Sequence, residues 1–147
     1  MRVVVQRVKR ASCTIDGKLY SEIGIGYLLL VGFTHTDSMK EVKYLAKKIA
    51  NLRVFEDENG KMNLSLKAVG GKILSISQFT LYADYKDGNR PAFINAMNPV
   101  SAKELYELFN EELKTYDISV ASGIFGADMK IDLLNDGPVT IIYDENL

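Results

Sequence analysis

Two helical patterns set among short β-prone runs place the strongest limit on how this chain can fold. One begins with Ser38-x-x-Glu41, the form of a helix capping box, and apolar residues then recur at spacings of three and four. The other begins with Ser101-x-x-Glu104 and shows the same apolar spacing. The remaining apolar runs are of strand length. The sequence therefore predicts an α+β fold with mixed or antiparallel β-sheets and two amphipathic helices.

The strand-length runs include one hairpin and one segment that is apolar almost throughout. Asp16-Gly17 separates the runs 11–15 and 19–23, and Asp-Gly between β-prone runs is a strong hairpin signal. The run 25–33 is expected to be buried on both faces of a sheet. Gly24 and Gly26 open this run, and because no helix follows them they are poor candidates for a dinucleotide-binding loop. Further strands are expected at 2–9, 54–55, 72–79, 118–121, 129–133 and 139–143.

Length and composition are those of an ordinary globular protein. The 147 residues are predicted to form a single domain, 1–147, and a hydrophobic content of 47% is sufficient for a core without disulfides or metal. No apolar run approaches the ~18 residues that cross a bilayer, and the first residues lack the apolar region of a signal peptide. The single cysteine, Cys13, cannot form an internal disulfide. We therefore expect a cytoplasmic protein.

The charge is balanced overall but uneven along the chain. A formal net charge of −1 argues against a protein that wraps long duplex nucleic acid, because such proteins carry a basic excess. Residues 1–53 nevertheless contain ten Lys and Arg against four Asp and Glu, whereas residues 54–147 contain eight against fifteen. The basic half includes Lys47 and Lys48 on the first predicted helix. It is basic enough to supply a local patch that faces phosphates.

Residue counts exclude several kinds of catalytic site. His35 is the only histidine, so no Ser-His-Asp, Cys-His or multi-histidine metal site can form within one chain. Cys13 lies in a predicted strand with no basic neighbour to lower its pKa, and it is interpreted as a small buried apolar residue. The acidic groups at 56–58 and 111–112 are interpreted as solvated faces. We expect no metal site and no cofactor.

Two polar segments stand next to apolar strands. Ser77-Gln78-Phe79-Thr80 follows a predicted buried strand, where polar groups can form the mouth of a site on a rigid scaffold. Hydroxyls satisfied by local backbone would explain the same residues. Asn135-Asp136-Gly137-Pro138 stands between two predicted strands and is typical of a turn. The sequence alone does not indicate whether the Gly-Pro bond is cis or trans.

These segments, taken together, resemble the D-aminoacyl-tRNA deacylase (D-tyrosyl-tRNA deacylase) family over the whole chain. Any one of the motifs is weak alone, but their order and spacing are kept. The matching motifs are Gln6-Arg7-Val8-x-Arg10-Ala11-Ser12, Gly60-Lys61-Met62-Asn63, Ser77-Gln78-Phe79-Thr80-Leu81, Asn89-Arg90-Pro91-x-Phe93, Gly123-x-Phe125-Gly126-Ala127-Asp128-Met129 and Asn135-Asp136-Gly137-Pro138-Val139-Thr140.

The resemblance implies a homodimer with a barrel-like core that hydrolyses the ester between a D-amino acid and the 3′-terminal adenosine of tRNA. It implies a cis Gly137-Pro138 dipeptide that each subunit inserts into the other's active site, where an L side chain would clash. Arg7 is implied to hold this segment by hydrogen bonds. Whether glycyl-tRNA is also a substrate is left open. The implied partners are the tRNA acceptor end and a second copy of the chain, with no membrane.

The resemblance also assigns roles to the polar segments. Ser77, Gln78 and the backbone around Phe79 and Thr80 would bind the adenosine and the reacting carbonyl. Thr80 is the obvious protein nucleophile, but no base is placed in sequence to activate it. The preferred hypothesis is attack by an ordered water with help from the ribose 2′-hydroxyl.

Two alternatives stay open, one for the role of the late loop, residues 123–129, and one for the function of the whole fold. Gly123, Phe125 and Met129 would line a pocket for the adenine, although Phe125 and Met129 could equally be core residues. The fold could also serve as a non-catalytic module that binds tRNA or assists editing. Hydrolysis of D- but not L-aminoacyl-tRNA would separate the enzyme from that module.

Overall fold

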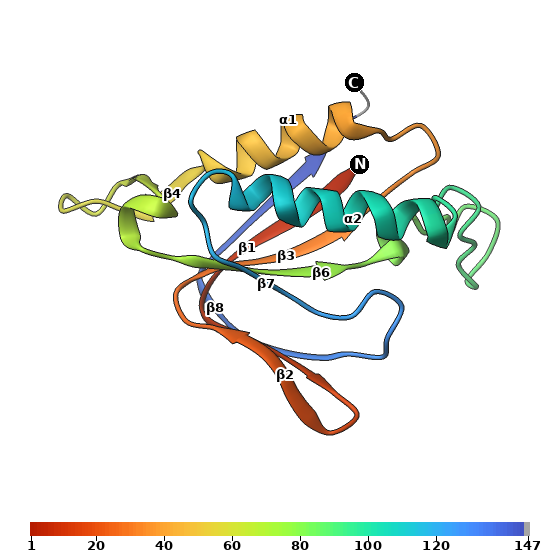
Figure 1. Ribbon diagram of the computed structural model, residues 1–147, viewed down its shortest axis with the longest axis horizontal. Helices are drawn as coiled ribbons and strands as arrows, with labels where there is room; N and C mark the ends of the chain where they lie inside the picture. Colours follow the sequence, from red (N-terminus) through yellow and green to blue (C-terminus); the bar gives the residue numbers. More distant parts are fainter. Residues whose placement is uncertain (146–147) are drawn as a thin grey trace.

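The computed structural model describes residues 1–145 and contains two helices on one side of a strongly curved sheet (Figure 1). The strands are β1 (Arg2–Ile15), β2 (Lys18–Ile23), β3 (Gly26–Gly32), β4 (Arg53–Glu56), β5 (Met62–Ser65), β6 (Lys72–Ser77), β7 (Val120–Ser122) and β8 (Lys130–Asp144). The α-helices are α1 (Met39–Ala50) and α2 (Pro99–Lys114), and short 3₁₀ turns are η1 (Lys67–Val69) and η2 (Phe79–Tyr82).

The long strand β1 organises the sheet. Its first half pairs antiparallel with β3 and its second half with β2, while β8 runs antiparallel along its other edge. The segments 2–9 and 11–15, predicted separately, are thus one strand of 14 residues. The predicted Asp16-Gly17 hairpin is confirmed, and both residues have the positive φ that a tight hairpin turn requires.

Parallel pairing continues the sheet toward near closure. β6 pairs parallel with β3, and β7 pairs parallel with β6. At the far edge, the Ser21 hydroxyl on β2 donates to the Ser122 carbonyl on β7 at 2.8 Å. The sheet is therefore mixed and nearly closed, which confirms the predicted barrel-like α+β fold.

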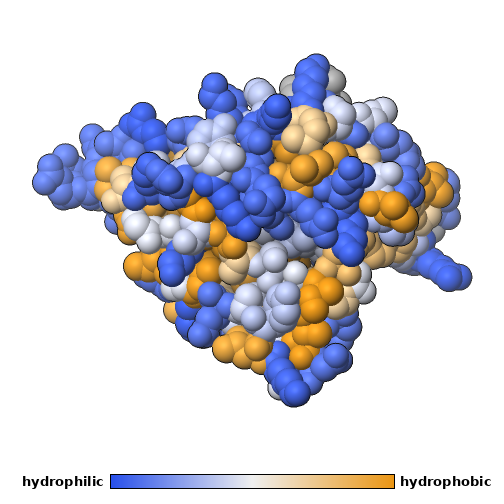
Figure 2. Space-filling view, in the orientation of Figure 1, coloured by the Kyte–Doolittle hydropathy of each residue, from blue (hydrophilic) through white to orange (hydrophobic). Residues whose placement is uncertain are grey.

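Both helices have the predicted amphipathic character, but one starts earlier than expected. The capping box of α1 is present, with the Ser38 N–H donating to the Glu41 carboxylate at 2.8 Å. In α2 the predicted start at Ser101 is wrong. The cap is Asn98, whose side chain accepts from the Ser101 N–H at 3.0 Å, and Pro99 is the first helical residue. The outer surface over the helices is largely hydrophilic (Figure 2).

The core lies on both faces of β3, as its continuous apolar sequence predicts. Leu29 and Val31 pack under the two helices, whereas Leu28 packs inside the curved part of the sheet with Cys13. None of the helices within residues 1–145 combines the length and apolar character needed to span a membrane.

Residues Asn135 to Pro138 do not form a turn between two strands, which corrects the sequence-based interpretation. They lie inside the single 15-residue strand β8. Gln6 pairs with Thr140 and Val8 with Asn135, so two steps along β1 are matched by five along β8. The extra residues form a wide bulge opposite Arg7. The backbone hydrogen bonds on either side of the bulge are what keep the strand continuous.

Candidate functional site

The parallel register of β3 and β6 brings the predicted polar segment to a cavity. Val31 pairs with Ser77, so both strands end at the same edge of the sheet. A cavity of about 450 Å³, within the size range of ligand pockets, opens there. It is lined by Leu30, Val31, Gly32, Phe33, Ile76, Ser77, Gln78, Phe79, Met97, Pro99, Ala102, Phe125, Gly126, Ala127, Asp128, Met129 and Ile131.

The segment after β6 turns sharply and leaves backbone donors free. The Gln78 N–H donates to the Val31 carbonyl at 2.7 Å, and the Leu81 N–H donates to the Gln78 carbonyl at 3.3 Å. Within residues 1–145, the N–H groups of Phe79 and Thr80 donate to no protein acceptor. Two neighbouring free donors beside a cavity can stabilise a developing oxyanion.

Thr80 is exposed on this turn, outside the residues that line the cavity. Its hydroxyl accepts a hydrogen bond from the side-chain amide of Gln78. An amide is not a base, and across residues 1–145 the Thr80 hydroxyl bonds to no His, Lys or carboxylate. The geometry therefore supplies no group that could take the proton of Thr80.

Arg2 supports the turn from the first strand. Its guanidinium donates to the Leu81 carbonyl and lies 4.7 Å from the centre of the Tyr82 ring. Tyr82 is buried, and this burial, with a smaller contribution from Asp37, raises the pKa of its hydroxyl. Arg2 thus anchors the end of the turn, at Leu81 and Tyr82, to β1.

The late loop completes the cavity with two of its three candidate residues. Phe125 and Met129 line the cavity, and Phe125 packs near Tyr106 with ring centres 6.1 Å apart. Gly123 lies behind them. A Cβ at this position would overlap the sulfur of Met129, so the glycine lets that side chain take its place in the wall.

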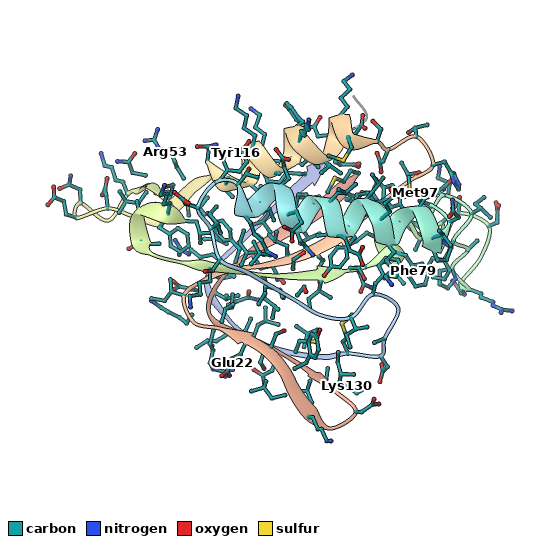
Figure 3. All side chains as sticks on the ribbon, viewed as in Figure 1. Glu22, Arg53, Phe79, Met97, Tyr116 and Lys130 are labelled. Atoms are coloured by element: carbon teal, nitrogen blue, oxygen red, sulfur yellow. The ribbon has the colours of Figure 1, made fainter. Side chains whose placement is uncertain are left out.

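Sequence reasoning missed several residues of the wall. Gly32 and Phe33 end the apolar run of β3, and Met97 precedes the true cap of α2. The sequence signal that could have indicated Met97 is Asn98-Pro99, a cap residue followed by a proline suited to the first helical position. A cap at Asn98 places Met97 just outside the helix. Figure 3 shows Phe79 and Met97 at the same end of the molecule.

The bulge in β8 holds a cis peptide bond between Gly137 and Pro138. Arg7 is only 5% exposed, and its Nε donates to the Asp136 carbonyl at 2.9 Å while a terminal nitrogen donates to the Val54 carbonyl at 2.6 Å. Gly137 has φ 128°, and a Cβ there would lie 3.1 Å from the Arg7 guanidinium. Arg7 therefore ties the bulge to β4, and only glycine fits between them.

The bulge and the cavity lie at different ends of one chain. Arg7, opposite the bulge, pairs with Tyr27 on β3, four residues before Val31 at the cavity edge. Four strand residues span about 13 Å, and β8 is three strands away from β6. In Figure 3, Arg53, the neighbour of the Val54 that Arg7 contacts, lies at one end of the molecule and Phe79 at the other.

The other candidate residues have structural surroundings. The His35 ring Nε2 lies 2.5 Å from the Ile94 carbonyl, and Cys13 is buried, which raises the pKa of its thiol. Lys47 and Lys48 are exposed on the last turn of α1, near β4 and away from the cavity of the same chain. Across residues 1–145, no group of three His, Cys, Asp or Glu side chains could hold a metal ion.

Comparisons with known proteins agree on one family. The family model described as D-Tyr-tRNA(Tyr) deacylase matches residues 4–144. The chain is 61% identical over 144 residues to the D-aminoacyl-tRNA deacylase of Fusobacterium nucleatum, a match that covers 98% of this chain and 95% of that one. It is 58% identical to the D-aminoacyl-tRNA deacylase of Limosilactobacillus reuteri, with 98% and 99% covered.

Solved structures share the fold. A chain named c-Myc DNA Unwinding Element Binding Protein superposes with a TM-score of 0.94 at 44% identity, with 100% of both chains covered. A second, described as a probable eukaryotic D-amino acid tRNA deacylase, superposes with a TM-score of 0.83 at 17% identity, with 98% of both covered. At that identity the second likeness shows the fold alone.

Proposed function

The chain belongs to the D-Tyr-tRNA(Tyr) deacylase family, whose members cleave the ester bond of D-aminoacyl-tRNA, and we propose that two copies of it together form each active site. One copy would supply the cavity beside Ser77 and Gln78, and the other would supply Gly137-Pro138. The aminoacylated 3′-terminal adenosine would occupy the cavity, with its adenine against Phe125 and Met129. We expect the enzyme to act in the cytoplasm.

The separation between the bulge and the cavity carries this proposal. Gly137 and Pro138 are exposed, and Arg7 holds the bulge that carries them by donating to the Asp136 carbonyl. They lie more than about 13 Å from the cavity of their own chain. A second copy, related by a two-fold axis, can bring its bulge to this cavity, and the same axis then fills the other cavity in return.

Chirality would be selected by rejection. With backbone carbonyls of Gly137-Pro138 placed against the α-carbon of the substrate, an L side chain would collide with the backbone while a D side chain would point into open space. The rigid bulge makes the collision costly because it cannot move aside. Since glycine has no side chain to collide, glycyl-tRNA would also be hydrolysed.

The hydrolysis itself would use the turn after β6. The free N–H groups of Phe79 and Thr80 would stabilise the oxyanion as water attacks the ester carbonyl. Oxygen from water bonds to the carbonyl carbon, the bond to the ribose 3′-oxygen breaks, and a proton reaches that oxygen. The ribose 2′-hydroxyl would assist the water, because Thr80 has no base beside it. Thr80 and Gln78 would position the reacting groups.

Matched D- and L-tyrosyl-tRNA test the proposal directly. We expect the D ester to be hydrolysed and the L ester to be hydrolysed at least about a hundredfold more slowly, since a steric clash of ~3 kcal/mol corresponds to that ratio. The measurement is the rate of amino acid release from each tRNA. Equal rates would overturn selection by Gly137-Pro138, and hydrolysis of neither ester would favour a module that only binds tRNA.

Charge reversal on α1 tests where the tRNA body lies. Lys47 and Lys48 lie on the last turn of α1, just before β4, to which Arg7 ties the bulge, so in the proposed dimer they would flank the other copy's cavity. The K47E/K48E double variant is expected to weaken tRNA binding and to lower the slope of log affinity against log salt by about 1–2. K18E, a charge reversal at an exposed site on β2, is the control. An unchanged slope would put the tRNA on another face.

A further inference from the structure

The loop between η2 and α2 exposes large side chains beside the cavity. Residues 85–95 are all exposed, and among them Tyr85 is 77% exposed and Ile94 71%. Phe93 is also exposed. Within residues 1–145, none of these three side chains belongs to either hydrophobic core cluster. Hydrophobic and hydrophilic residues lie side by side on the right-hand side of the molecule, where this loop lies (Figures 1 and 2).

The loop has a defined shape despite this exposure. Asp84 and Ala92 exchange two backbone hydrogen bonds, of 2.7 and 2.8 Å, which set Tyr85 and Phe93 next to a paired bridge. The Thr34 hydroxyl donates to the Asn95 carbonyl at 2.6 Å, which anchors the far end of the loop to the end of β3. The exposed side chains are therefore presented on a fixed support.

The loop of residues 85–95 packs directly against the wall of the cavity. The Phe93 ring packs edge to face against Phe79, with ring centres 4.9 Å apart, and Phe79 lines the cavity. On the other side, the Met97 N–H donates to the Phe33 carbonyl at 3.0 Å, and both of these residues line the cavity too. A ligand that leaves the cavity at this rim passes directly onto the loop.

The loop also carries two cations, Lys86 and Arg90, along with two carboxylates, Asp84 and Asp87. Lys86 and Arg90 are exposed, and neither forms an ion pair with a carboxylate of the part of the chain that the structure describes. Exposed aromatic rings interleaved with free cations suit single-stranded nucleic acid, because bases stack on the rings while the cations meet the phosphates.

We propose that Tyr85, Phe93 and Ile94 form a stacking surface for the nucleotides that precede the terminal adenosine of the tRNA acceptor end, with Lys86 and Arg90 facing their phosphates. This rests on the proposed function, because it requires the terminal aminoacyl-adenosine to occupy the adjoining cavity. Bases of a single-stranded RNA end are commonly recognised by stacking on aromatic side chains. The loop would thus extend recognition beyond one nucleotide without contacting the reacting ester.

Two substrates of different length isolate the loop. D-tyrosyl-adenosine fills only the cavity, whereas a D-tyrosylated oligonucleotide ending in cytidine-cytidine-adenosine also reaches the loop. The Tyr85→Ala variant is expected to lower kcat/KM for the oligonucleotide by about 5- to 100-fold, the effect of losing one stacked base. Its kcat/KM for D-tyrosyl-adenosine should stay within about twofold. Tyr85→Phe should restore the oligonucleotide rate, because the ring remains.

A control variant and a second measurement distinguish the stacking surface from a contact between copies. Tyr20→Ala removes another exposed aromatic side chain, on β2, and should change neither rate. Equal loss on both substrates, or loss on neither, would overturn the stacking surface. A Tyr85→Ala variant that changes oligomeric state by light scattering would also overturn it, in favour of contact between copies. If the proposed function itself is wrong, the unaltered protein will not hydrolyse D-tyrosyl-adenosine at all, which is distinct from any effect of Tyr85→Ala.

Discussion

Replacing the 2′-hydroxyl of the terminal adenosine by hydrogen is expected to slow single-turnover hydrolysis of D-tyrosyl-tRNA by roughly 10²- to 10⁴-fold, the usual contribution of a general acid or base. Thr80→Ala is expected to slow the same step by no more than about tenfold, the loss of one neutral hydrogen bond. The reason is structural. The hydroxyl of Thr80 meets only the Gln78 amide, which cannot accept its proton.

Both changes are measured in single-turnover experiments with enzyme in excess, so that product release does not hide the chemical step. Thr115→Ala is a matched control, because Thr115 is an exposed threonine that bonds locally to the Glu112 carbonyl at 2.6 Å. An intact rate on the 2′-deoxy substrate would contradict the assisted-water mechanism. If Thr80→Ala abolished the step as well, Thr80 would be the nucleophile.

The second large effect concerns folding. Gly26→Ala is expected to prevent stable folding, because the new Cβ would overlap the carbonyl oxygen of Lys72 and lie 2.8 Å from the Lys72 nitrogen. This backbone belongs to β6, which is paired on both edges and cannot move aside. Overpacking of this kind costs about 3 kcal/mol or more, a large part of the ~5–15 kcal/mol that stabilises a domain.

Gly24→Ala is the control for this prediction, because no atom lies within 4 Å of a Cβ built there. It should change the free energy of unfolding by less than about 0.5 kcal/mol. Denaturant unfolding followed by circular dichroism measures both variants. A Gly26→Ala protein with an unchanged midpoint would show that β3 and β6 can separate, and the register that brings Ser77 to Val31 would then not depend on this glycine.

Elements with strong local signals were predicted well. The capping box at Ser38, the Asp16-Gly17 hairpin and the buried run of β3 all appear as expected, because each depends on residues close together in sequence. The start of α2 was missed because two polar residues compete for the cap, and Pro99, which favours the first helical position, decides for Asn98.

The wrong prediction of a turn at residues 135–138 also has a physical cause. Asn135-Asp136-Gly137-Pro138 has the composition of a turn, but β1 supplies hydrogen bonds on both sides of it, so the chain returns to the same strand. Arg7 of β1 holds the extra residues of β8 by donating a hydrogen bond to the Asp136 carbonyl. Tertiary contacts outweigh turn propensity here because they are formed by a partner strand that local composition does not include.

Local patterns along the chain are enough to predict the α+β class, the positions of both helices and most strands, and a family resemblance spread over the chain. The residues near Ser77 and Phe125 could be identified as candidates in the same way. The three-dimensional arrangement alone brings these two segments into one cavity, adds Met97 and Phe33 to it, and places Gly137-Pro138 far from it. The physical reason is that local patterns depend on neighbouring residues, whereas a cavity depends on strand register, which is set by pairing across the whole sheet.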